Sequence, residues 1–288
     1  MRTLQRVLWF PFREASAFVA WLIYHVMSLC ARRHSRRFLL SWHGLCALYP
    51  RWFGAFRVAL KENFSAIYEN NAWGSSESVS GGGSTSGHTQ VIREALPVLL
   101  KDLGVRTLLD IPCGDFNWMK EVPLEIARYI GADIVPELVA LNTKRFGKQK
   151  PAIVDFLELD ITTDRLPTMD LILCRDCLVH LCFDDIWRAI NNIRQSNSQY
   201  LLTTTFRDLD RNIDIVSGAW RPLNLQLPPF AFPAPVRIVN EYRTAAESRG
   251  YPDKSLGLWR IADMPVSPGA KRQGVPEARN WQGRDRKA

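Results

Sequence analysis

The 288-residue sequence has little cysteine, no internal repeat and no uncharged run long enough to span a membrane. Its six cysteines are scattered, without the close and even spacing of a disulfide-stapled secreted domain, which favours a reducing, cytoplasmic environment. Cys174, Cys177, His180 and Cys182 crowd together but lie on one expected strand and its exit, with no second ligand pair elsewhere, so we expect no metal site. The longest uncharged stretch, residues 15–31, has 17 residues, whereas a transmembrane helix needs about 20.

An excess of positive charge is also missing from the middle of the chain, although the net charge of the whole sequence is +8. Residues 1–57 carry nine arginines and one glutamate, and residues 271–288 carry six basic and two acidic side chains. Residues 58–270 are mildly acidic, with 22 basic and 26 acidic side chains. We therefore expect no sequence-specific contact with nucleic acid, because the basic groove that such contact needs is absent from the central part. Basic ends fit an anionic phospholipid surface or another polyanion.

Residues 1–57 combine arginines with aromatic side chains such as Trp42, Trp52 and Phe53. Interfacial membrane segments use this combination, with rings at headgroup depth and guanidinium groups on anionic lipid. Three interpretations stay open: a helical arm associated with or anchored in the inner membrane, helices packed on the domain, or a targeting peptide. The other basic end, residues 271–288, is expected to be a disordered tail.

Residues 58–87 are expected to be a connecting segment that ends in a loop rich in glycine and serine. The sequence of residues 70–87, NNAWGSSESVSGGGSTSG, has the composition of a flexible linker. The functional alternative is a loop that lies over a bound cofactor, with Trp73 stacking on it and hydroxyls and amides donating hydrogen bonds.

From residue 88 the chain alternates strand-like and helix-like apolar patterns, which predicts an α/β domain over residues 88–270. Such alternation is typical of a doubly wound, Rossmann-like sheet that is mostly parallel and covered on both faces, and the last strand-like run fits an antiparallel edge. We expect strands at residues 106–111, 128–134, 154–161, 169–174, 199–206, 236–242 and 255–262. We expect helices at residues 89–103, 117–126, 136–146 and 183–194.

Acidic residues follow three of the expected strands: Asp110, Asp133 and Asp160. Ligands of doubly wound sheets bind beyond the carboxyl ends of the strands, where these side chains gather. Asp133 follows Asp110 by 23 residues, close to the offset of about 20 at which an acid accepts hydrogen bonds from ribose hydroxyls. Asp160 would accept from an adenine amine, and Gly114 lets the chain turn sharply beside the ligand.

The turn after the first strand, DIPCGD, separates two classes of cofactor. A dinucleotide site needs the pattern G-x-G-x-x-G, so that a pyrophosphate rests on backbone amides at a helix N-terminus. Here Pro112 lacks an amide hydrogen, and Asp115 is expected to repel a diphosphate. S-adenosylmethionine carries a sulfonium and an ammonium, which acidic side chains attract.

Several segments resemble class I S-adenosylmethionine-dependent methyltransferases. LLDIPCGD resembles the first motif of that family, GADIVPELV its ribose-binding second strand, LELDIT its adenine-side loop, and LILCRDCLVHL its fourth strand and exit. The chain is also similar to a bacterial subgroup with WGSxES before the first helix and WRPLNL late in the chain. The resemblance covers about residues 73–265 and departs from the family where glycine is common, at Pro112 and Phe116. It implies S-adenosylmethionine as cofactor, with these residues around it: Asp110, Cys113, Gly114, Asp133, Ile134, Asp160 and Ile161.

Asp176 and His180, after the fourth strand, are the expected catalytic residues. Either would act as a base if the acceptor is a hydroxyl or a protonated amine, and Asp176 has a second interpretation as a contact of the methionine ammonium. The irregular stretch of residues 208–235 is expected to bind the acceptor, a sugar or another small polar or acidic molecule, or a glycan. Its candidate residues are Arg211, Trp220, Arg221 and Asn224. Two alternatives stay open: an NAD(P)-dependent oxidoreductase and a nucleotide-binding module without turnover.

Overall fold

A seven-stranded sheet forms the centre of the computed structural model, which describes residues 59–147, 153–248 and 250–267. The strand order is β3-β2-β1-β4-β5-β7-β6. The first five strands are parallel to one another, and β7 is antiparallel to both of its neighbours, with β6 outside it at the edge. The strands are β1 (Thr107–Asp110), β2 (Arg128–Asp133), β3 (Ile153–Glu158), β4 (Leu171–Cys174), β5 (Tyr200–Phe206), β6 (Arg237–Asn240) and β7 (Lys254–Arg260).

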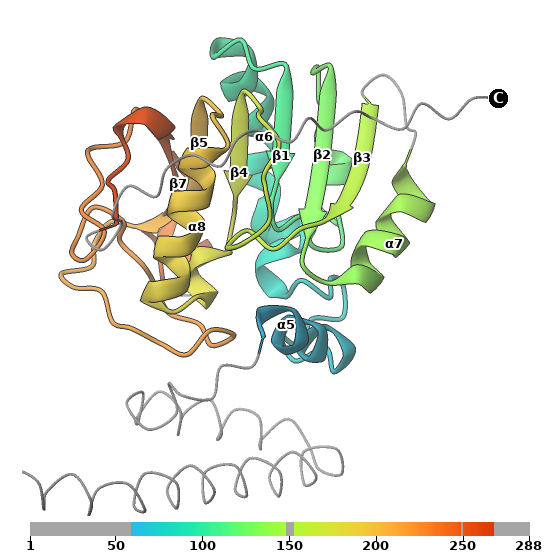
Figure 1. The fold of residues 1–288 in the computed structure, drawn as a ribbon, viewed down its shortest axis with the longest axis horizontal. Helices are drawn as coiled ribbons and strands as arrows, with labels where there is room; N and C mark the ends of the chain where they lie inside the picture. The colour runs from blue at the N-terminus through green and yellow to red at the C-terminus, as the bar shows by residue number, and fades with distance from the viewer. Residues whose placement is uncertain (1–58, 148–152, 249, 268–288) are drawn as a thin grey trace, which may run out of the picture.

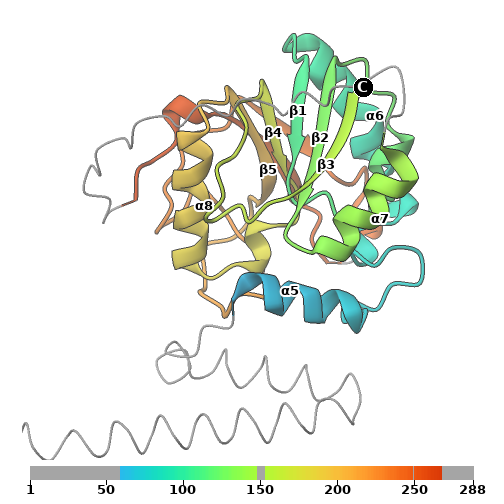
Figure 2. The ribbon, with the colours of Figure 1, turned by 45° about the vertical axis from the view of Figure 1, so that its right-hand side comes forward.

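Helices cover both faces of the sheet, as the alternating pattern predicts (Figure 2). Helix α8 (Phe183–Gln195) buries Ile186, Ile190 and Ile193 on one face. Helix α6 (Ser86–Asp102) buries Ile92, Leu96, Leu99 and Leu100 on the other, and α7 (Pro136–Phe146) packs on the same side. This spacing of three or four residues gives each helix one apolar stripe, so the sheet has a core on each face.

A further helix, α5 (Leu60–Glu69), lies across the carboxyl ends of the strands (Figure 1). Its Leu60 and Phe64 pack against the core on the α8 face. An ion pair joins Lys61 to Glu158 at the end of β3, and the Asn63 amide donates to the Ser217 carbonyl at 2.6 Å. The segment that we expected to be a connection is therefore part of the folded domain.

The prediction of a helix at residues 117–126 is wrong. Only a 3₁₀ turn, Met119–Glu121, forms there. Phe116 has φ +59°, the Asn117 side chain bonds Glu77 and the Ser84 carbonyl, and Pro123 has no amide hydrogen to continue a helix. The third strand also ends earlier than expected, because the Asp160 carboxylate accepts the amide of Thr162 and closes a turn.

The expected arm of residues 1–57 and the expected tail of residues 271–288 lie outside the described residues. Within the described ranges, no helix combines the length and the apolar character needed to cross a membrane.

Candidate active site

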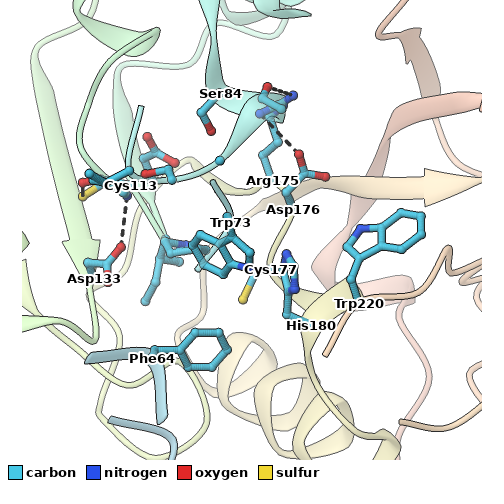
Figure 3. Close-up of a pocket in the computed structure, with 18 of the residues that line it drawn as sticks. Phe64, Trp73, Ser84, Cys113, Asp133, Arg175, Asp176, Cys177, His180 and Trp220 are labelled. Atoms are coloured by element: carbon cyan, nitrogen blue, oxygen red, sulfur yellow. Dashed lines mark hydrogen bonds and ion pairs between the residues drawn. The ribbon is translucent and has the colours of Figure 1, made fainter. Parts of the chain in front are cut away.

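A cavity of about 460 Å³ opens at the carboxyl edge of the sheet. Its size falls in the range of small-molecule sites, about 300–1,000 Å³. The ends of β1, β2 and β4 form its wall, α5 lies against it, and the loop of glycines and serines before α6 lines it from Val79 to Ser84. The cavity is shown in Figure 3. Of the expected site residues, it is lined by Trp73, Asp110, Cys113, Gly114, Asp133, Ile134, Asp160, Ile161, Asp176, His180 and Trp220.

The turn after β1 uses all of its own amides. Pro112 has none, and the Cys113 amide donates to the Ala132 carbonyl at 2.8 Å. The Gly114 amide donates to the Asp133 carboxylate at 3.0 Å, and the Asp115 amide donates to the Ser80 hydroxyl at 3.0 Å. No α-helix begins here. The turn therefore offers a diphosphate neither free amides nor a helix N-terminus.

Asp115 holds the loop of glycines and serines against this turn. Its carboxylate accepts the Ser78 hydroxyl at 3.0 Å, the Val79 amide at 3.0 Å and the Ser80 hydroxyl at 3.2 Å. It does not line the cavity, so it does not repel a diphosphate by direct contact, as the sequence led us to expect. The flexible-linker interpretation of residues 70–87 is wrong as well, because these hydrogen bonds order the loop and Ser78 is buried.

Gly114 has no space for a side chain. It has φ +56°, and a Cβ atom there would lie 2.1 Å from the Ser80 hydroxyl oxygen. This close approach seats the loop directly on the turn. Gly83, in the same loop, lies against Asp176, where a Cβ would come within 3.2 Å of a carboxylate oxygen.

Two buried carboxyl groups face the cavity from the ends of β1 and β2. Burial raises the pKa of Asp110 to about 7, although the Tyr129 hydroxyl donates to it at 2.6 Å. Burial also raises the pKa of Asp133 to about 6, against the hydrogen bonds from the amides of Val135 and Gly114. Three backbone amides, those of Val135, Gly114 and Ile134, stabilise the Asp133 carboxylate, whose two oxygens have about four acceptor positions. Asp133 is therefore able to accept a further hydrogen bond from a hydroxyl.

Asp176 belongs to a cluster of two cations and two anions. Lys254 Nζ lies 2.7 Å from Asp176 and 3.2 Å from Glu241, and Arg175 contacts Glu241 at 2.6 Å and Asp176 at 3.4 Å. Burial by itself would raise the pKa of Asp176, but the Lys254 ammonium and the Arg175 guanidinium hold it well below its usual range. Asp176 is thus ionised at neutral pH and is a weak proton acceptor.

His180 is the better proton acceptor. Its Nδ1 lies 2.9 Å from the Ala219 carbonyl, which only accepts, so Nδ1 carries the proton and Nε2 is the acceptor nitrogen. Burial lowers the pKa of His180, against the hydrogen bond to Ala219, so the ring is neutral at pH 7. Figure 3 shows the imidazole between Trp73 and Trp220, and its centroid lies 5.2 Å from that of Trp73.

Three of the four expected acceptor residues do not line the cavity. Arg211 is exposed. Arg221 is buried and donates to the carbonyls of Ile213, Leu178 and Leu181, at 2.8–3.1 Å. Asn224 is buried and bonds the Arg207 carbonyl and the Asn212 side chain. For Arg221 and Asn224 the interpretation is wrong because backbone carbonyls take the polar groups that we assigned to the acceptor. Arg211 is outside the cavity lining.

Several cavity residues were not predicted from the sequence. Lys254 and Tyr251 precede or open β7, Tyr242 follows β6, and Phe64 comes from α5. Three of them lie in or beside β6 and β7, and β7 pairs with β5 at the end of the parallel sheet. This pairing is a tertiary feature that the local sequence does not contain. No group of three or more side chains suited to a metal occurs in the part of the chain that the structure describes.

The chain is similar to known methyltransferases in part of its sequence and in its fold. The sequence model of a family described as a methyltransferase domain matches residues 109–198, and no curated protein matches the chain. The N-methyltransferase NodS of Bradyrhizobium japonicum WM9, solved with S-adenosylhomocysteine, is 17% identical over 69% of this chain and 98% of that chain, with a TM-score of 0.51. A methyltransferase of Leishmania major that depends on S-adenosylmethionine is 15% identical over 73% of this chain and 89% of that chain, with a TM-score of 0.52. The chain therefore has the fold of S-adenosylmethionine-dependent methyltransferases.

Proposed function

We propose that this chain is a methyltransferase that binds S-adenosylmethionine in the cavity at the carboxyl edge of the sheet and passes its methyl group to a small molecule. The observation that carries the proposal is the pairing of a turn without free amides with buried carboxyl groups that face the cavity. A diphosphate finds no donors in that turn, whereas a sulfonium and an ammonium are attracted by the carboxyl groups. This argues against the oxidoreductase alternative.

The cavity residues suit the parts of this cofactor. Asp133 would accept its ribose hydroxyls, Asp110 and Gly114 would lie on its methionine side, and Ile134 and Ile161 would enclose its base. When bound, S-adenosylmethionine supplies a methyl group from a sulfonium whose sulfur keeps the bonding electron pair. We assign to His180 Nε2 the proton that an acceptor hydroxyl or ammonium loses, and to Asp176 the place of a fixed anion.

Calorimetric titration of the full chain with S-adenosylhomocysteine, NADH and NADPH tests this assignment. We expect S-adenosylhomocysteine to bind and NADH and NADPH not to bind. The Asp133→Asn variant should bind S-adenosylhomocysteine at least tenfold more weakly, because only one of the two polar atoms of an amide side chain accepts hydrogen bonds. Glu125→Gln is the control, since Glu125 is exposed and away from the cavity. Binding of NADH without binding of S-adenosylhomocysteine would overturn the proposal.

Turnover separates the enzyme from a binding module of the same fold. Incubation with S-adenosylmethionine labelled in its methyl group, together with fractionated small-molecule, lipid and glycan extracts, should transfer label to one fraction. The His180→Gln variant should abolish that transfer and leave the affinity for S-adenosylhomocysteine unchanged. Cofactor binding without transfer to any fraction would point to the module.

We also propose, from the sequence of residues 1–57, that this arm holds a cytoplasmic enzyme against an anionic membrane surface. The nine arginines and the interleaved aromatic residues support it.

A further inference from the structure

The cavity collects the exposed aromatic side chains of the domain. Within the described residues, Trp73, Trp220 and Tyr251 are the most exposed of the large aromatic side chains, at 38%, 44% and 37%. All three line this one cavity, although they come from the loop before α6, the irregular stretch after β5 and the approach to β7. Exposed aromatic rings gathered at one site indicate a ligand that covers them.

The aromatic residues form two groups near His180. Trp73 lies against His180, at 5.2 Å between centroids, and against Phe64 at 6.5 Å. Trp220 packs edge-on against Tyr251 at 5.2 Å and against Phe206 at 6.1 Å. The backbone of residues 218–221 holds the second group beside the first, because the Gly218 amide donates to the His180 carbonyl and the Arg221 amide donates to the Val179 carbonyl.

The charged side chains on this side of the cavity are paired with one another. Asp176 and Lys254 are paired with each other, and Arg175 and Glu241 complete a cluster without net charge. Arg221 and Asn224, which would have bound sugar hydroxyls or an acidic group, bond the protein's own backbone. A sugar or an anion would therefore lose its hydration here and meet few charged groups that are not already paired.

We propose that the methyl acceptor is an uncharged, flat aromatic molecule that carries a hydroxyl group, with its ring between the Trp73 and Trp220 groups and its hydroxyl donating to His180 Nε2. Aromatic rings stack favourably on indole and phenol rings, and a neutral acceptor matches a wall without net charge. That this ligand is a methyl acceptor rests on the proposed function, but its binding to the cavity can be measured without any methyl transfer.

Binding of two alcohols with the same carbon skeleton tests the inference. The first is 2-naphthol, which is flat, and the second is decahydro-2-naphthol, which is saturated and puckered; methyl β-D-glucopyranoside represents a sugar. Each is titrated calorimetrically into the full chain, with and without saturating S-adenosylhomocysteine. We expect 2-naphthol to bind at least tenfold more tightly than its saturated counterpart, and the glucoside to bind more weakly than either.

The variants Trp220→Leu and Tyr251→Leu locate the site, since each removes a ring but keeps an apolar side chain. Each variant should lower the affinity for 2-naphthol at least fivefold and change the affinity for S-adenosylhomocysteine by less than twofold. Val98 is exposed on α6 and lies away from the cavity, so Val98→Ala should change neither affinity. The inference would be overturned by equal affinity for the two alcohols or by tighter binding of the glucoside. It would also be overturned if neither substitution changed the affinity for 2-naphthol. If S-adenosylhomocysteine does not bind, the proposed function fails, while titrations of the free chain still decide between a flat and a puckered ligand.

Discussion

Asp110 is a carboxyl group buried at the end of β1, and we expect its replacement by asparagine to stabilise the free protein at alkaline pH. The side chain is 2% exposed and burial raises its pKa to about 7. In the unfolded chain the pKa is about 3.9. As the pH rises from about 4 to about 7, the unfolded state therefore ionises first, and the folded state loses stability relative to it. The Asp110→Asn variant removes this loss, and its amide oxygen still accepts the Tyr129 hydroxyl.

The size of the effect follows from the two pKa values. They differ by about three pH units, and each unit corresponds to about 1.36 kcal/mol, so the carboxylate lowers the free energy of unfolding by up to about 4 kcal/mol at pH 8. At pH 4 the folded state is protonated and the unfolded state is about half ionised, so the difference between variant and wild type falls below about 1 kcal/mol. The same change removes a charge from the cavity wall, so the affinity for S-adenosylhomocysteine should fall about tenfold at pH 8.

Urea unfolding of wild type and Asp110→Asn at pH 5, 6, 7 and 8 measures this difference. The variant's advantage should grow by about 1 kcal/mol per pH unit from pH 5 to pH 7 and level off between pH 7 and pH 8, where both states ionise. Glu125→Gln should follow the wild type at every pH. A difference that does not change with pH would refute the reasoning, because it would mean that Asp110 ionises in the folded protein as it does in water.

Three further changes test other parts of the structure. Gly114→Ala should destabilise the fold by at least about 2 kcal/mol in urea unfolding, because φ is +56° and the new Cβ would meet the Ser80 hydroxyl; a neutral effect would contradict the close packing of loop on turn. Lys254→Met should lower the free energy of unfolding by about 2 kcal/mol. This is less than the loss expected on breaking a fully buried ion pair, because Asp176 is a quarter exposed and still contacts Arg175. Unchanged stability at pH 7 would argue against the cluster. Deletion of residues 1–57 should release the protein from sedimenting vesicles that contain anionic lipid and leave the affinity for S-adenosylhomocysteine intact, whereas loss of folding would show that the arm belongs to the core.

The fold was predictable because its signals are local. Each parallel strand is a short apolar run, and α7 and α8 have apolar residues three or four apart, so the expected ranges agree with the structure within a few residues. The missing helix after β1 depends on contacts that the local pattern does not contain. Asn117 bonds Glu77, a residue 40 positions earlier, and these bonds hold the turn open.

Part of the cavity wall was predictable for the same reason, since Asp110 and Asp133 end strands and Asp160 follows one, and the carboxyl ends of these strands meet at one edge. The part assigned to the acceptor was not. A polar residue in a long loop has the same local sequence whether it faces a ligand or a backbone carbonyl, and Arg221 turned out to face carbonyls. Lys254 was missed because its partner Asp176 lies 78 residues earlier in the chain.

The ion cluster also determines how late in synthesis the wall of the cavity is completed. Arg175 donates to the carbonyl of Gly83 in the loop before α6 and pairs with Glu241, which pairs in turn with Lys254 at the start of β7. Domains are synthesised from the N-terminus, and contacts between distant positions form late. The cluster in the wall of the cavity is therefore incomplete until residue 254 has left the ribosome. A nascent chain that ends before β7 lacks Lys254 and the pairing of Asp176 with it.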